Sequence, residues 1–243
     1  MGALTARIGR LYQYDNISEN FFLASRNKSY DFGDGICFIE RYKPYLIKCF
    51  PYSYKGELDL LQHANKLTTC DSLKSALQKY KDLLRRSTHI ISHINKPWQA
   101  EPTVENLQPK VSLNRGHRFV MALQGAVTNY KDITARAKND VDALYTWLLE
   151  EHYSVLNKIE GCASIMFSHI SKNITPSVFV FSTNIDPLYH IYYRNVHFIS
   201  SNKDSLYLFE ILENDIKIDT IPQDRLFRYT LGLKDPLEIK ITV

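Results

Sequence analysis

Short apolar segments with the composition of β-strands follow one another after Gly161, and they constrain the fold more than any other feature. Residues that favour strands, mainly Ile, Phe, Val and Tyr, dominate these segments. The expected strands cover residues 163–168, 177–182, 188–192, 197–200 and 216–220, and a helix fits residues 203–212. Successive strands with short connections usually pair antiparallel. The C-terminal part of the chain therefore predicts antiparallel sheet.

The earlier part of the chain alternates strand-like and helix-like segments. Strands are expected over residues 36–50, 88–94 and 117–127, the last two as adjacent central strands, and helices over residues 58–86 and from residue 139. Pro44 marks a turn or an edge, and Asp71, Ser72 and Asn139 are candidate helix caps. Two helical layers that enclose antiparallel strands make an α+β fold, a four-layer αββα sandwich. We expect residues 1–243 to form one such domain.

Composition excludes several classes of protein. Hydrophobic residues make up 44% of the 243 residues, enough for a continuous core. No stretch approaches the roughly 20 apolar residues of a membrane span, and the N-terminus lacks the layout of a signal peptide. We therefore expect a cytoplasmic protein without membrane contact. The net charge of +4 is dispersed and does not indicate nucleic-acid binding.

Cysteine and histidine spacing gives no metal motif. The four cysteines, which show no short paired spacing, are Cys37, Cys49, Cys70 and Cys162. They are predicted to be reduced and buried. His89 and His93 lie four residues apart in a strand-like segment without the Glu of a zinc-protease helix. A structural role for both histidines is favoured over a metal site, and no metal or other cofactor is expected.

Six segments, in order along the chain, resemble motifs of the class II glutamine amidotransferases. They are residues 1–9, 28–36, 89–102, 119–133, 138–142 and 157–164. The best match is residues 119–133, where an apolar strand leads into Gln124-Gly125 in place of the family's Asn-Gly. The segments resemble those in the glutaminase halves of glucosamine-6-phosphate synthase and amidophosphoribosyltransferase. The resemblance implies the fold of the N-terminal-nucleophile hydrolases, which is again an αββα sandwich.

The same resemblance shows substitutions where the family does its chemistry. Gly2 stands at the position of the nucleophilic Cys, whose freed α-amine is the base in the family. Asn95 replaces the Arg that holds the α-carboxylate of glutamine, and Gln124 replaces the Asn that, with the glycine at Gly125, forms the oxyanion hole. Asp140 matches the carboxylate that receives the substrate's α-amine, and it is equally explained as a first-turn acidic residue of a helix.

These observations leave three functions open. The leading one is a catalytically inactive amidotransferase-like protein, whose vestigial pocket is lined by Asn95, Gln124, Gly125 and Asp140. Such a protein would be a binding, regulatory or structural module with a protein partner or a second copy of itself, for example in a viral or other large assembly. Without the Arg, little affinity for glutamine is expected. The second is a stand-alone subunit that handles glutamine or ammonia for a separate synthase. The third is a hydrolase that uses Thr5 as nucleophile after processing.

Overall fold

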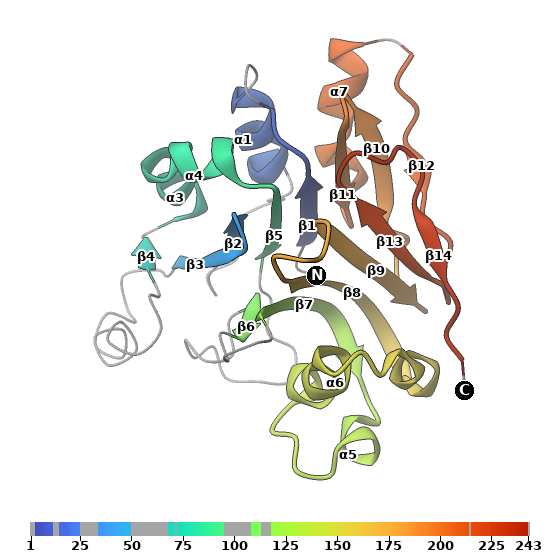
Figure 1. Ribbon diagram of the computed structural model, residues 1–243. Coiled ribbons are helices and arrows are strands. Elements are labelled where there is room, and N and C mark those ends of the chain that lie inside the picture. The colour runs from blue at the N-terminus through green and yellow to red at the C-terminus, as the bar shows by residue number, and fades with distance from the viewer. Residues whose placement is uncertain are drawn as a thin grey trace.

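Two antiparallel sheets lie face to face between helices in the computed structural model (Figure 1). The structure describes residues 3–11, 15–24, 34–49, 68–70, 72–94, 108–112, 118–213 and 215–242. Within these ranges the helices cover the outer face of each sheet, so the expected four-layer αββα sandwich is confirmed.

Sheet A contains eight of the described strands in the order β12-β10-β11-β1-β5-β2-β3-β4. Their bounds are β1 (Ala3–Ile8), β2 (Asp34–Glu40), β3 (Lys43–Cys49), β4 (Thr68–Cys70), β5 (His89–Ile94), β10 (Tyr189–Tyr193), β11 (Val196–Ser200) and β12 (Asp219–Thr220). All neighbours are antiparallel except β3 and β4, which are parallel. The N-terminal strand β1 is central in this sheet, between β11 and β5.

Sheet B contains six described strands in the order β14-β13-β9-β8-β7-β6. Their bounds are β6 (Lys110–Ser112), β7 (Arg118–Val127), β8 (Gly161–Ile170), β9 (Ser177–Thr183), β13 (Leu226–Thr230) and β14 (Leu237–Ile239). Strands β7, β8 and β9 are buried on both faces because helices cover one side and sheet A covers the other. This explains why their sequences are nearly continuous apolar runs.

Helices pack on the outer face of each sheet. Sheet A carries α1 (Asp15–Ala24), α3 (Leu73–Lys79), α4 (Lys81–Arg86), the 3-10 turn η3 (Lys203–Ser205) and α7 (Tyr207–Leu212). Sheet B carries α5 (Tyr130–Ile133), α6 (Asp140–Leu149) and the 3-10 turn η2 (Tyr153–Lys158). Two expected caps are confirmed. Ser72 accepts a hydrogen bond from the Ser75 amide at the start of α3, and Asn139 accepts one from the Asp142 amide at the start of α6.

The apolar core between the sheets identifies which face each strand residue occupies. Leu4, Ala6 and Ile8 of β1 belong to this core, together with Val120 and Ala122 of β7. Further members are Met166 of β8 and Val178 and Val180 of β9. Because side chains alternate between the two faces of a strand, the residues between these positions face the helices instead.

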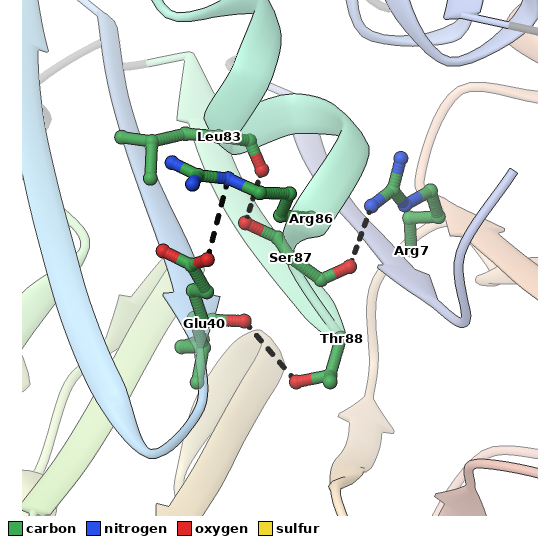
Figure 2. A network of polar contacts seen from close by, with 7 residues as sticks. Arg7, Glu40, Leu83, Arg86, Ser87 and Thr88 are labelled. Carbon is green, nitrogen blue, oxygen red and sulfur yellow. Dashed lines mark hydrogen bonds and ion pairs between the residues drawn. The ribbon is translucent and has the colours of Figure 1, made fainter. Parts of the chain in front are cut away.

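A polar network joins sheet A to its helices, and it includes the buried Arg7 of β1 (Figure 2). Its guanidinium donates to the Ser18 hydroxyl in α1 at 2.9 Å and to the carbonyls of Leu84 and Ser87 at 2.8 and 2.9 Å. These carbonyls close the C-terminal end of α4, where a cation is favoured by the helix dipole. Nearby, Arg86 of α4 pairs with Glu40 of β2 at 3.3 Å.

The structure corrects three expectations of the secondary structure. Strands β5 and β7 are in different sheets and face each other, so they are not neighbours in one sheet. The turn after β2 lies at Arg41 and Tyr42, both with positive φ. Pro44 is inside β3, in the part of that strand that pairs with β2 alone among the described strands, so of the two expectations for Pro44 the edge is confirmed. Residues 68–70, expected in a helix, form β4, and residues 110–112, where no strand was expected, form β6. Residues 58–67 lie outside the described residues.

Candidate functional site

The central strand β1 turns an apolar face toward sheet B. Leu4, Ala6 and Ile8 lie in the inter-sheet core, whereas Thr5 alternates to the other face. Thr5 pairs in register with Ser200, whose hydroxyl accepts a hydrogen bond from Ser205 of the helical layer at 2.8 Å. Thr5 therefore faces the helices and not sheet B. Two other positions of interest, Gly2 and Asn95, lie outside the described residues.

A row of three polar side chains crosses the inter-sheet face of sheet B. Gln124 of β7 pairs with Ser164 of β8, and Ser164 pairs with Ser182 of β9. All three occupy the face that carries Val120, Met166 and Val180 elsewhere, so they form a continuous row, which we call the inter-sheet polar row. Their exposed fractions are 8%, 0% and 1%. Among the described residues, the hydroxyls of Ser164 and Ser182 have no hydrogen-bond partner.

His93 of β5 approaches this row from sheet A. It pairs in register with Leu4 and is 3% exposed, and its imidazole makes a hydrogen bond with the backbone of Leu123, the neighbour of Gln124. Burial lowers the pKa of His93 to about 4, although the hydrogen bond to Leu123 acts in the opposite direction. The imidazole is therefore neutral at pH 7. Its Nδ1 atom has no partner within the described part of the chain.

Gly125 fixes the approach of β7 to β8 beside the polar row. Its φ is +107°, and a Cβ atom there would lie 2.1 Å from the carbonyl oxygen of Cys162. Gly161 on the neighbouring strand makes the reciprocal contact, with φ +111° and a would-be Cβ 2.3 Å from the Ala126 carbonyl oxygen. A side chain is excluded at both positions. The family's glycine at this point thus has a packing role in this chain.

Asp140 anchors helix α6 to the end of β7. Its carboxylate accepts hydrogen bonds from the amides of Val127 at 3.3 Å and Val141 at 2.8 Å. Burial raises the pKa of Asp140, and the backbone hydrogen bonds oppose that shift. These contacts support the interpretation of Asp140 as a first-turn residue that stabilises the helix, with the family's amine-binding role left as a prediction.

An Asp140→Ala substitution tests that interpretation. Removing the carboxylate leaves two backbone amides without their acceptor, so the free energy of unfolding should fall by about 2 kcal/mol in the absence of any ligand. Urea unfolding measures it. Asp142→Ala is the control, because the partly exposed Asp142–Lys110 pair contributes below about 1 kcal/mol. Equal stability of wild type and Asp140→Ala would leave only a ligand-binding explanation for Asp140.

Sequence reasoning found Gln124, Gly125 and Asp140 but missed the two serines. Ser164 and Ser182 lie in mainly apolar strands, where a small polar residue carries no signal by itself. Only the register across β7, β8 and β9 shows that they continue the row from Gln124. The signal available in the sequence was their odd polarity on the strand face that otherwise bears Met166 and Val180.

The buried histidines predict a loss of stability in mild acid. Burial lowers the pKa of His89 to about 3, with the positive charge of Arg7 adding to the effect, and that of His93 to about 4. In the unfolded chain both have pKa values near 6.5. Below about pH 6.5 the unfolded state therefore binds protons that the folded state does not. Stability is fully present above that pH and falls toward pH 4 by about 1.4 kcal/mol per pH unit for each histidine.

Urea unfolding at pH 7.5, 6 and 5 measures this loss. The His89→Gln substitution removes one of the contributing groups, so it should reduce the slope by about 1.4 kcal/mol per pH unit. His89 Nε2 also shares a hydrogen bond of 2.9 Å with the Ser168 hydroxyl. The amide of a Gln side chain can replace this hydrogen bond in part. A stability that is constant between pH 7.5 and 5 would contradict the neutral buried state of these histidines.

The fold resembles that of solved amidotransferases. Glutamine phosphoribosylpyrophosphate amidotransferase from B. subtilis, complexed with ADP and GMP, matches with a TM-score of 0.68 and 11% identity, over 99% of this chain and 50% of that chain. A structure of the allosteric regulatory enzyme of purine biosynthesis gives the same four values. A glutamine aminotransferase class-II domain protein from Silicibacter pomeroyi matches with a TM-score of 0.47 and 13% identity, over 98% and 97% of the two chains.

These likenesses establish the fold of the class II glutamine amidotransferases, as the sequence motifs implied. The chain spans about half the length of the first two proteins. No protein-family profile matches it, and no curated protein sequence is similar enough to match. In the described part of the chain, no helix is long and apolar enough to cross a membrane, and no three His, Cys, Asp or Glu side chains converge as metal ligands.

Proposed function

We propose that this chain is a catalytically inactive module with the amidotransferase fold, which acts by binding and not by hydrolysis. The observation that carries the proposal is the sequence at the start of β1, whose face toward sheet B consists of the apolar Leu4, Ala6 and Ile8. In the family the nucleophile stands at the start of this strand, and here the sequence has Gly2. Glycine offers no side chain that could attack a carbonyl carbon.

The orientation of the Thr5 side chain supports the same proposal. Thr5 is buried on the helical side of β1, in register with Ser200 and Ser92. A hydrolase that used Thr5 as its N-terminal nucleophile would need this side chain to face the inter-sheet polar row. In addition, Gln124 is one methylene longer than the family's Asn, so its amide reaches a shifted position relative to any oxyanion.

An exposed apolar surface on α7 supports a binding role with a protein partner or a second copy of the chain. Ile211 is 85% exposed, Leu212 50% and Tyr207 39%. Apolar side chains that gather on one short helix are typical of interaction sites. The proposed binding role includes membership of a larger assembly, viral or other.

A glutamine analogue that carries a diazoketone tests the proposal, because such a reagent alkylates the nucleophile of glutaminases. Intact-mass measurement should show that the reagent leaves the mass of the wild type unchanged and that this mass corresponds to a chain beginning at Met1 or Gly2. A Cys162→Ala variant controls for alkylation of the partly exposed thiol of Cys162. An adduct at the N-terminal residue, or the mass of a chain that begins at Thr5, would contradict the proposal.

A further inference from the structure

Strand β14, at one end of sheet B, exposes side chains on both of its faces (Figure 1). Leu237 is 57% exposed, and the side chain of Glu238 is 49% exposed. Lys240, just after the strand, is exposed as well. The end strand of a sheet can pair through its backbone N–H and C=O groups with a strand from another chain. Residues 237–241, which we call the edge segment, are therefore within reach of such a partner.

The two faces of the edge segment differ in polarity. Ile239 and Ile241 pack against the core between sheet B and its helices, and Leu237 lies on the same face because side chains alternate along a strand. Glu238 pairs in register with a residue of the inter-sheet core, so it lies on the opposite face together with Lys240. One face of the edge segment is thus apolar, and the other carries one acidic and one basic side chain.

This pattern selects one register for pairing with a second copy. Two copies related by a two-fold axis pair antiparallel, and opposite residues share a face, so the axis passes through a residue and not between two residues. An axis at Glu238 or at Lys240 sets that residue against its own copy, which places like charges opposite each other. An axis at the central residue, Ile239, pairs the whole segment. It sets Glu238 of each copy against Lys240 of the other.

The side chains of the edge segment fit this register on both faces. Glu238 contacts Arg225 of its own copy through Oε2 at 3.3 Å, and its second oxygen, Oε1, can accept a hydrogen bond from the ammonium group of Lys240 of the other copy. On the apolar face, Leu237 lies opposite Ile241 of the other copy. Pairing therefore covers the exposed Leu237 with an aliphatic side chain, which is favourable.

We propose that the edge segment binds a second copy of this chain by antiparallel strand pairing about a two-fold axis at Ile239. A Glu238–Lys240 ion pair forms on either side of the axis, and sheet B continues from one copy into the other. A paired segment of this length is a small interface, so the dimer is weak and depends on protein concentration. The inference goes beyond the proposed function, because this pairing is independent of glutamine hydrolysis.

Charge reversal at the edge segment tests the ion pairs. Sedimentation equilibrium from micromolar to millimolar protein should show the mass rising from 28.3 kDa toward twice that value. Glu238→Lys sets like charges opposite each other on either side of the axis, so the dissociation constant should rise about 30-fold, and Lys240→Glu should have the same effect. A variant with both substitutions restores opposite charges, and it should dimerise as the wild type does.

Cysteine substitution tests the register. In a background with Cys162→Ala, which removes the partly exposed native thiol, Ile239→Cys places two thiols opposite each other. Facing Cβ atoms lie about 5 Å apart, within a small shift of disulfide geometry. Leu237→Cys is the matched control, because its two copies lie about 14 Å apart along the strands. With copper phenanthroline as the oxidant, non-reducing electrophoresis should show a linked dimer for Ile239→Cys and not for Leu237→Cys.

Three results would overturn the proposal. One is a mass that stays at 28.3 kDa up to millimolar concentration. Another is a dimer that links equally well through Leu237→Cys, or that the single charge reversals leave intact while circular dichroism shows them folded. The third is a dimer that Ile211→Ser dissociates, because Ile211, 85% exposed, belongs to α7 and not to the edge segment. All these readouts are independent of the diazoketone experiment, so a failure here is distinguishable from a failure of the proposed function.

Discussion

A Gly125→Ala variant should lose most of its stability. The residue has φ +107°, which an L side chain rarely adopts, and a Cβ atom would meet the Cys162 carbonyl oxygen at 2.1 Å. That oxygen belongs to the backbone of β8, so relief of the clash requires β7 and β8 to separate at their paired ends. Backbone strain and lost strand pairing together should cost about 3 kcal/mol or more. Urea unfolding followed by circular dichroism measures the loss.

Gly232→Ala separates the two contributions to this loss. Gly232 also has positive φ, at +85°, but a Cβ atom there would meet nothing within 4 Å. Its substitution should therefore show the backbone strain alone, about 1 kcal/mol. If Gly125→Ala cost no more than Gly232→Ala, the close approach of β7 and β8 described above would be incorrect.

An Arg7→Met variant should lose about 3 to 5 kcal/mol of stability. Arg7 is 1% exposed, and its guanidinium donates to the Ser18 hydroxyl and to the carbonyls of Leu84 and Ser87. Figure 2 shows the contact with Ser87. Methionine fills part of the volume but donates no hydrogen bond, so buried acceptors at the end of α4 lose their partner. Thermal unfolding measures the change, which should appear as a large decrease in the unfolding midpoint.

Arg86→Met is the matched control from the same network. Arg86 pairs with Glu40 at 3.3 Å, but its side chain is 59% exposed, so solvent screens the pair. Its loss should change the free energy of unfolding by less than about 1 kcal/mol. Comparable losses in the two variants would show that the burial of Arg7 is not what makes its contacts strong.

The layers of the fold were predictable from the sequence, but the pairing of strands was not. Apolar runs and helix caps located β8, β9, α3 and α6, because periodicity and capping are local properties. Whether β5 and β7 pair or face each other depends on long-range contacts that a strand sequence does not encode. Strand β13 was missed, because Arg228 and Thr230 give its short sequence little apolar character.

The candidate site was predictable only in part for the same reason. The resemblance to amidotransferases led to Gln124, Gly125 and Asp140, whose chemical types belong to a known motif. It could not lead to Ser164 and Ser182, which become neighbours of Gln124 only through the register of β7, β8 and β9. The face of β1 on which the Thr5 side chain lies likewise became known from the pairing of Thr5 with Ser200, and the residue type alone does not indicate it.

Glutamine hydrolysis by the purified protein is the most direct test of the central claim, that the amidotransferase fold persists here without its chemistry. The amide nitrogen of glutamine is followed by NMR with ¹⁵N-labelled substrate at millimolar concentration, over hours, against an active glutaminase as reference. The account predicts no ammonia above the rate in buffer, for wild type and for Thr5→Ala alike. Catalytic release of ammonia by the wild type would contradict it, and loss of that release in Thr5→Ala would identify the nucleophile.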